Sequence, residues 1–184
     1  DVSADSWYGA AVIWASENGI VNGVGGGLFD PDASLTREQM AMMLYRFAGY
    51  LGSNTEKRAD LSAYGDADAV SAFAQDAMAW AVAEGLVNGR SAAELAPKAG
   101  ATRAELATIL FRYVVYKGLD LVTLEDNLSR FSDRNEISSY AVSAMNWAVG
   151  QGLVKGSGGK LNPKGNATRA QVAAILHRFC ELGK

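Results

Sequence analysis

Three arginines stand where a predicted helix begins, a place that is unfavourable for a cation. Each follows a threonine, and the three are spaced 66 residues apart: Arg37, Arg103 and Arg169. The first turn of a helix is the positive end of its dipole, so an arginine there needs another reason. Helix N-termini bind anions, and a guanidinium adds a planar fork of donors that matches a carboxylate or phosphate. The pattern indicates anion binding.

A structural role for the same arginines is the alternative. Each arginine could pair with a carboxylate of a neighbouring unit and so join the units. Acidic residues stand at matching places before the first helices: Asp1, Asp66 and Asp133. The spacing alone leaves both roles open.

The helices that carry these arginines have a defined start and one apolar face. A threonine followed at the third position by Glu or Gln is a capping box, in which the two side chains satisfy amides that the helix leaves free. The pairs are Thr36 and Gln39, Thr102 and Glu105, Thr168 and Gln171. Apolar residues then recur at i, i+3, i+4 and i+7 in every copy. A second arginine keeps the step of 66 residues: Arg46, Arg112 and Arg178.

An earlier helix in each unit is marked by a tryptophan: Trp14, Trp80 and Trp147. Seven residues before each tryptophan comes another aromatic: Trp7, Phe73 and Tyr140. A glycine five residues after the tryptophan predicts the helix end. A second glycine follows in the loop: Gly23, Gly89 and Gly156. Self-similarity at a fixed period identifies a repeat architecture, here of three helix–loop–helix units. A further short helix is predicted within residues 118–130, where Leu121, Leu124 and Leu128 have helical spacing.

Composition narrows the functional classes. The net charge is −3 and no block of like charges occurs, which argues against nucleic acid, whose binders carry basic patches. No apolar run approaches the roughly 20 residues needed to span a bilayer. Because the chain starts at Asp1 without a Met, we expect a segment of a longer protein, and the missing signal sequence says nothing about secretion.

Nothing in the sequence favours catalysis or a metal. His177 is the only histidine, and Cys180, the only cysteine, follows it by three residues. Two such ligands without a Cys or His companion make a poor metal site, and no repeated acid pair is typical of a glycosidase. We therefore expect no enzyme activity, no cofactor and no metal.

The repeated motifs resemble the S-layer homology (SLH) family. That family begins with a Phe-x-Asp-Val-like entry, continues with a Trp-Tyr-x-x-Ala-Val helix and a Gly-Ile-x-x-Gly turn, and ends with a Gly-x-Phe-x-Pro loop and a Thr-Arg-Ala-Glu helix. The first unit matches with Trp7-Tyr8, Gly19-Ile20, Gly23, Phe29, Pro31 and Thr36-Arg37-Glu38. The third matches with Phe131-Ser132-Asp133, Gly156, Pro163 and Thr168-Arg169-Ala170. The second has drifted in its loop but keeps Thr102-Arg103-Ala104-Glu105.

The resemblance implies a mainly α fold in which three motifs form one pseudo-threefold unit. It implies non-covalent anchoring of a surface protein to the bacterial cell wall, outside the cell, through secondary cell wall polysaccharide linked to peptidoglycan. The family's ligand is typically pyruvylated N-acetylmannosamine, bound in grooves between motifs. Other copies of the parent surface protein are a further expected partner.

By the same resemblance, Arg37, Arg103 and Arg169 hold the pyruvyl carboxylate. Trp14, Trp80 and Trp147 offer a sugar-stacking face, with a core position as the alternative. Gly23, Gly89 and Gly156 let the backbone approach the sugar, with plain turn geometry as the alternative. Asp1, Asp66 and Asp133 complete the expected ligand-binding set.

The expected domain is residues 1–184, made of unit 1 (1–52), unit 2 (53–118) and unit 3 (119–184). The grooves are chemically unequal. Glu94 in the second loop is expected to weaken the site of Arg103, whereas Lys155 and Lys160 strengthen a site in unit 3. The alternative function is a self-assembly or protein–protein interaction module without glycan binding.

Overall fold

The computed structural model describes residues 1–119 and 125–182, and these residues are mainly helical. Each unit contributes a short and a long α-helix in chain order. They are α1 (Gly9–Glu17), α2 (Arg37–Tyr50), α3 (Gln75–Ala83), α4 (Arg103–Tyr116), α5 (Val142–Gly150) and α6 (Arg169–Glu181). Two short 3-10 helices precede α3, namely η1 (Ala67–Ala69) and η2 (Ala72–Ala74). Two more precede α5, namely η3 (Arg134–Glu136) and η4 (Ser139–Ala141). The predicted mainly α fold of three helix–loop–helix units is confirmed. The helix predicted within 118–130 lies partly outside the described residues, and 125–130 form turns and bends.

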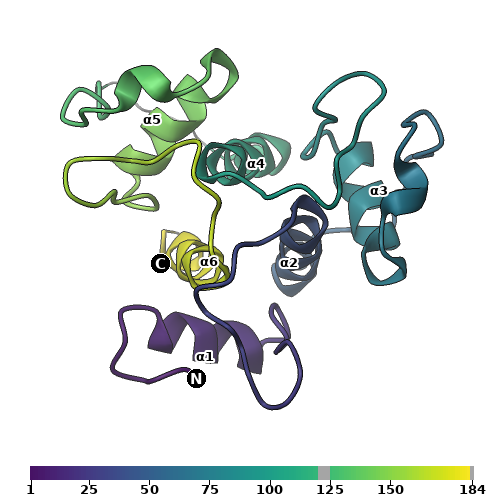
Figure 1. Ribbon diagram of the computed structural model, residues 1–184, viewed down its shortest axis with the longest axis horizontal. Coiled ribbons are helices and arrows are strands. Elements are labelled where there is room, and N and C mark those ends of the chain that lie inside the picture. Colours follow the sequence, from purple (N-terminus) through teal and green to yellow (C-terminus); the bar gives the residue numbers. More distant parts are fainter. Residues whose placement is uncertain (120–124, 183–184) are drawn as a thin grey trace.

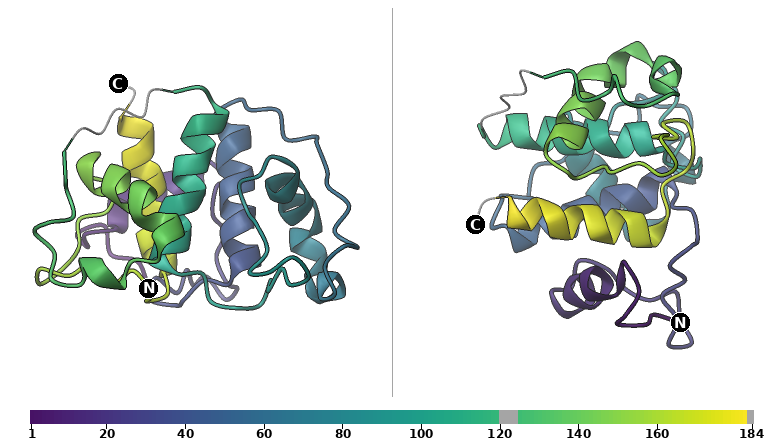
Figure 2. Two further views of the ribbon diagram at one scale, coloured as in Figure 1. Left: turned by 90° about the horizontal axis from the view of Figure 1, so that it is seen from above. Right: turned by 90° about the vertical axis from the view of Figure 1, so that its left-hand side faces the viewer.

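The long helices form the centre of the molecule and the short helices lie outside them (Figure 1). Each short helix packs on the long helix of the preceding unit: α3 on α2, and α5 on α4. Helix α1 has no preceding unit and packs on α6, the last helix of the chain. Figure 2 shows α2, α4 and α6 running side by side. Each short helix therefore packs on the long helix of another unit, and the contact of α1 with α6 closes these contacts into a cycle.

A ring of backbone hydrogen bonds joins the three units just before the long helices. The Leu35 amide donates to Ala167 O at 3.0 Å, the Ala167 amide to Ala101 O at 2.8 Å, and the Ala101 amide to Leu35 O at 2.9 Å. Each of these residues immediately precedes the threonine of a capping box. The ring thus places all three Thr-Arg pairs at one end of the molecule.

An aromatic trio fills the space between the central helices. Phe47, Tyr113 and Phe179 occupy the same place in their units, and their ring centroids lie 5.7 to 6.3 Å apart. The Tyr113 hydroxyl lies 2.7 Å from the Ser53 hydroxyl, so its polar atom is satisfied. Burial raises the pKa of Tyr113.

All three predicted capping boxes are formed. In each, the threonine side chain accepts from the backbone amide three residues later and the Glu or Gln side chain returns to the threonine amide. The first two amides of each long helix donate to carbonyls of the next unit in the cycle. For α2 these are Arg37 N to Ala99 O and Glu38 N to Pro97 O. The amides at these helix starts are therefore already used.

Candidate ligand-binding grooves

The three repeated aspartates hold the loop of their own unit and form no ion pair with the repeated arginines among the described residues. The Asp133 carboxylate accepts from the amides of Leu161 and Asn162 at 2.7 to 3.1 Å. Asp66 does the same for Leu95 and Ala96, and Asp1 for Phe29 and Asp30. The structural alternative was an ion pair between each arginine and a carboxylate of a neighbouring unit. The aspartates proposed for it are not the partners, but Arg37 does pair with a carboxylate of unit 2, that of Glu105.

These amide contacts affect the acidity of the aspartates. The Leu95 amide lowers the pKa of Asp66 below its ordinary value. Burial raises the pKa of Asp133, but the amides of Leu161 and Asn162 lower it more, so the net shift is downward. Both carboxylates are consequently ionised at neutral pH.

The repeated arginines reach across to the same loop residues from the preceding unit. The Nε atom of Arg103 donates to Leu161 O at 2.7 Å. Arg37 and Arg169 donate in the same way to Leu95 O and Phe29 O. Each loop residue is thus held at its amide by an aspartate and at its carbonyl by an arginine. All three arginines thus have a structural role through Nε, whose partner is a backbone carbonyl.

The two outer nitrogens of each guanidinium differ in what they contact. Those of Arg37 are both used, Nη1 on Glu105 at 2.5 Å and Nη2 on Asn88 O at 2.6 Å. Nη2 of Arg169 donates to Asn22 O. For Arg103, neither outer nitrogen has a hydrogen-bond partner in the part of the chain that the structure describes. Arg103 therefore presents the fork that an anion needs.

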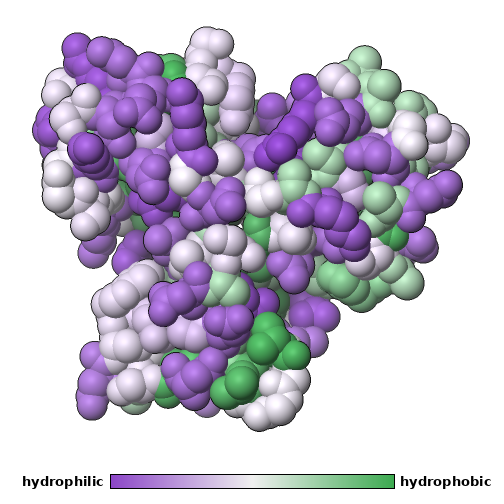
Figure 3. Space-filling model, in the orientation of Figure 1, coloured by the Kyte–Doolittle hydropathy of each residue, from purple (hydrophilic) through white to green (hydrophobic). Residues whose placement is uncertain are grey.

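Two hollows in the surface contain these arginines. Groove III, on unit 3, has a volume of about 820 Å³. Its lining includes Trp7, Arg103, Asp133, Lys155, Lys160 and Arg178. Groove II, on unit 2, has a volume of about 490 Å³. Its lining includes Arg37, Asn88, Arg90, Glu105, Arg112 and Tyr140. Each groove thus takes residues from all three units, and Figure 3 shows the surface indented between lobes.

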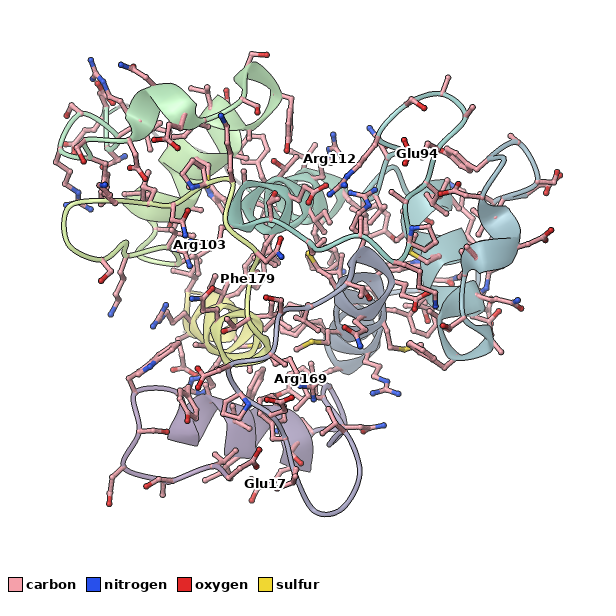
Figure 4. The ribbon with its side chains drawn as sticks, viewed as in Figure 1. Glu17, Glu94, Arg103, Arg112, Arg169 and Phe179 are labelled. Carbon is pink, nitrogen blue, oxygen red and sulfur yellow. The ribbon has the colours of Figure 1, made fainter. Side chains whose placement is uncertain are left out.

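A third hollow, of about 660 Å³, lies on unit 1 and differs in kind. It is lined by Asp1, Ile13, Glu17 and Gly23, among others, and Arg169 is not part of this lining. Figure 4 shows Glu17 on the outer side of α1, whereas Arg169, the first residue of α6, lies on the inner side of α1. The Arg169 guanidinium instead lies over the Phe29 ring, 4.5 Å from its centroid.

The repeated tryptophans do not line grooves II and III, and two of them belong to the core. Trp80 is 0% exposed and Trp147 is 3% exposed, so neither offers a face to a sugar. Trp14 is partly buried and contacts Tyr50 and His177. The expectation of sugar stacking is thus wrong for Trp80 and Trp147, and the core alternative holds for them.

The aromatics seven residues earlier are the exposed ones. Trp7 is 62% exposed, and Phe73 and Tyr140 are each 56% exposed. Trp7 lines groove III and Tyr140 lines groove II. Burial raises the pKa of Tyr140, and the charge of Glu105 raises it further, as expected for two groups that face one groove. The sequence signal for these residues was their repetition, seven residues before each tryptophan.

Other groove residues were also missed. Arg112 and Arg178 belong to the second repeated set of arginines, and they line grooves II and III. Their Nη1 atoms donate to Leu86 O at 3.1 Å and Leu153 O at 3.0 Å. Burial lowers the pKa of both guanidinium groups. Each groove is therefore lined by two repeated arginines, Arg37 and Arg112 in groove II and Arg103 and Arg178 in groove III.

The repeated glycines are best explained by the turn. Gly89 and Gly156 line the two grooves, but a Cβ at either position would lie 2.4 to 2.7 Å from a carbonyl oxygen of its own loop. A Cβ at Gly23 would lie 2.7 Å from Leu28 O. These contacts are too short for a side chain, so the turn itself demands glycine.

The acidic residue that reaches a groove arginine is Glu105. Its side chain is 12% exposed, and it lies 2.5 Å from Arg37 and 3.6 Å from Arg90. Glu94, by contrast, is exposed and lies on the loop of unit 2 (Figure 4). It is not part of the lining of groove II. The expectation that Glu94 weakens the site of Arg103 therefore has no support, because Arg103 lines the groove of unit 3.

Among residues 1–119 and 125–182, no cluster of three His, Cys, Asp or Glu side chains could hold a metal ion. Within the same ranges no helix is long and apolar enough to cross a membrane.

Comparison with known proteins identifies the family. The model of the S-layer homology domain matches residues 1–41, 63–107 and 130–173. The chain belongs to the S-layer homology family. Each matched segment runs from the entry aspartate or just before it into the long helix, and so contains the aspartate, the loop and the first repeated arginine of its unit.

Similar proteins include a surface-layer protein, an exoglucanase and an endoglucanase. The S-layer homology chain is 35% identical over 171 residues to the surface-layer 125 kDa protein of Lysinibacillus sphaericus, covering 89% of the chain and 13% of that protein. It is 34% identical over 111 residues to exoglucanase XynX of Acetivibrio thermocellus, covering 60% of the chain and 10% of that protein. It is 28% identical over 180 residues to an endoglucanase of Bacillus sp. (strain KSM-635), covering 96% of the chain and 18% of that protein. The chain thus spans less than a fifth of the length of each of these relatives.

Proposed function

We propose that this S-layer homology domain anchors a surface protein to the bacterial cell wall by binding secondary cell wall polysaccharide, at the outside of the cell. The ligand we propose is a glycan containing pyruvylated N-acetylmannosamine. The observation that carries the proposal is the Arg103 guanidinium, whose outer nitrogens have no partner within the described residues while it lines the 820 Å³ groove III.

Groove III has the groups that an acidic sugar requires. A carboxylate can accept two parallel hydrogen bonds from the Arg103 fork. Trp7, which also lines this groove, offers an exposed apolar ring to a sugar face, and Lys155 and Lys160 add positive charge. Trp7 replaces the tryptophans of the short helices as the stacking residue in this proposal.

The proposed partner is the wall glycan linked to peptidoglycan, with other copies of the parent protein as a second partner. The domain is an anchoring module, and the activities named in XynX and the endoglucanase are properties of those proteins. We propose no catalytic residue, no cofactor, no nucleic acid partner and no membrane insertion.

Calorimetric titration tests the proposal. The ligand is a disaccharide with a pyruvylated N-acetylmannosamine, compared with the same disaccharide without pyruvate. A charge-assisted hydrogen bond is worth about 1.5–3 kcal/mol, so loss of the pyruvyl group should weaken binding by about ten- to a hundred-fold. Equal affinity for the two glycans would remove the carboxylate from the mechanism.

Self-assembly without glycan binding is the second candidate. Figure 3 shows an apolar patch on the lobe that holds α1, and Val24 and Leu28 in that unit are 55% and 50% exposed. Such patches can mark interaction surfaces. Under this alternative, sedimentation velocity would show concentration-dependent oligomers and the wall glycan would not bind.

A further inference from the structure

The residue that completes the capping box differs between grooves II and III. It is Glu105 in groove II and Gln171 in groove III. Both cap their helix through one oxygen, which accepts from the threonine amide at 2.7 Å for Glu105 and 3.3 Å for Gln171. Capping therefore does not require the second carboxylate oxygen of Glu105.

That second oxygen is bound to the arginine of the groove. Oε1 of Glu105 lies 2.5 Å from Nη1 of Arg37 and 3.6 Å from Nη2 of Arg90. With Leu95 O on Nε and Asn88 O on Nη2, each nitrogen of the Arg37 guanidinium has a partner. The Arg37 side chain is 4% exposed. Groove II thus already contains a carboxylate where an acidic ligand would place its own.

Arg103, the equivalent arginine of groove III, differs from Arg37 in the contacts of its outer nitrogens. Arg103 uses Nε on Leu161 O and leaves both outer nitrogens without a partner in the described part of the chain. Gln171, at the place of Glu105, is uncharged. A ligand carboxylate entering groove III therefore displaces no internal carboxylate.

We propose that Glu105 determines specificity: it excludes the acidic sugar from groove II, so that the pyruvylated unit binds in groove III and groove II takes an uncharged sugar unit. The proposal rests on the glycan-binding function proposed above. Its physical basis is competition, because the Glu105 carboxylate is tethered beside Arg37 and needs no association entropy to bind it. A ligand carboxylate would also meet the like charge of Glu105.

Substitutions that exchange the two capping residues test the proposal. Glu105→Gln keeps an acceptor for the Thr102 amide, as Gln39 and Gln171 do in their own boxes. It should create a second site for the methyl glycoside of pyruvylated N-acetylmannosamine, seen in calorimetry as a stoichiometry that rises from one to two. The reciprocal change, Gln171→Glu, should weaken binding of this probe in groove III by about tenfold or more. The same glycoside without pyruvate is the control, and its binding should change little in either variant.

The site that is gained can be assigned by working in an Arg103→Ala background. There the acidic probe should bind weakly, and adding Glu105→Gln should restore binding through Arg37. Thermal unfolding of each variant verifies that it is folded, and Gln171→Glu tests the idea without altering Arg103.

Two outcomes separate this inference from the proposed function. If the unsubstituted protein prefers the pyruvylated probe but Glu105→Gln gains no second site, the inference is overturned and the anchoring function stands. If the unsubstituted protein binds both probes equally or neither, the proposed function fails and this inference fails with it.

Discussion

One position in the repeat carries two roles in this protein. Arg37, Arg103 and Arg169 all fix the loop of the next unit through Nε. Only the remaining donors distinguish them: those of Arg37 are occupied, whereas those of Arg103 have no partner among the residues that the structure describes. A single residue type at equivalent places therefore serves mainly the fold in one unit and is available for a ligand in another.

The two roles predict that Arg37→Ala lowers stability more than Arg103→Ala, whereas Arg103→Ala lowers glycan affinity more than Arg37→Ala. Arg37→Ala leaves Glu105 poorly solvated without its main partner and should lower the free energy of unfolding by about 3–5 kcal/mol. Arg103→Ala removes one hydrogen bond from a charged donor and should cost about 1.5–3 kcal/mol, which is more than its place at a helix start suggests. For binding of the pyruvylated glycan, Arg103→Ala should be the more damaging change.

Urea unfolding of the two variants measures their loss of stability, and calorimetry of the same variants measures their loss of glycan affinity. Arg103→Lys is the matched control, since it keeps the charge and loses the planar fork, and should recover only part of the affinity. A greater loss of glycan affinity in Arg37→Ala would place the acidic sugar in groove II and contradict the assignment.

Acid should weaken the fold through the aspartates that hold the loops. Folding lowers the pKa of Asp133 below its ordinary value of 3.8, so the ionised carboxylate stabilises the folded protein. This contribution is complete above the unfolded pKa of about 3.9. It is lost as the pH falls through the lower pKa of the folded protein. Asp133→Asn should therefore be less stable at about pH 6. The difference in unfolding free energy between the two proteins should shrink below about pH 4. Urea titrations across this range measure it, and a constant difference would exclude the ionic contribution.

At the scale of elements, the start of each long helix is the most constrained segment. Two amides bind carbonyls of the next unit, and the third binds the capping threonine. These contacts leave no free amide for a ligand, so the expected contribution of the helix N-terminus to anion binding is absent. What the helix start provides is a fixed position for the arginine side chain.

Loss of one cap should be measurable on its own. Thr102→Ala removes the acceptor for the Glu105 amide, which lies 3.1 Å away, and should reduce stability by about 0.5–2 kcal/mol. Thr102→Ser keeps the hydroxyl and should cost much less. Thermal or urea unfolding of the pair provides the comparison, and equal losses would show that the methyl group, not the cap, matters here.

At the scale of the whole molecule, the sequence units are not the packing units. Helix α1 packs on α6 and helix α2 on α3, so unit 1 holds two helices whose partners lie in other units. We therefore propose that residues 1–184 fold as one domain, with cores shared across the boundaries at 52/53 and 118/119.

A fragment of residues 1–52 should be unfolded or aggregated. It keeps α1 and α2 but removes α3 and α6, against which their apolar faces are buried, and a unit this small is marginal even with a complete core. Circular dichroism and two-dimensional NMR of the fragment, beside the full chain, measure this. A fragment that unfolds cooperatively as a monomer would show that the unit is autonomous.

The sequence by itself determined the repeat, the helices, their capping boxes and the family. These depend on local patterns: apolar spacing, a threonine three residues before Glu or Gln, and glycines where the turn excludes a Cβ. Each is repeated three times in register, which makes the pattern far stronger than one copy.

Only the tertiary structure decided which repeated residues face a ligand. Trp7 and Trp14 are seven residues apart, which is two helical turns, so the sequence places them on one face. The helix begins only at Gly9, and Trp7, in the preceding turn, is exposed in groove III, whereas Trp80 and Trp147 in the short helices are buried. The partners of the arginine Nε atoms were equally hidden, because they are backbone carbonyls 58 to 140 residues away in the chain. A carbonyl is the same in every residue, so no side-chain pattern reveals it until the units close into their cycle.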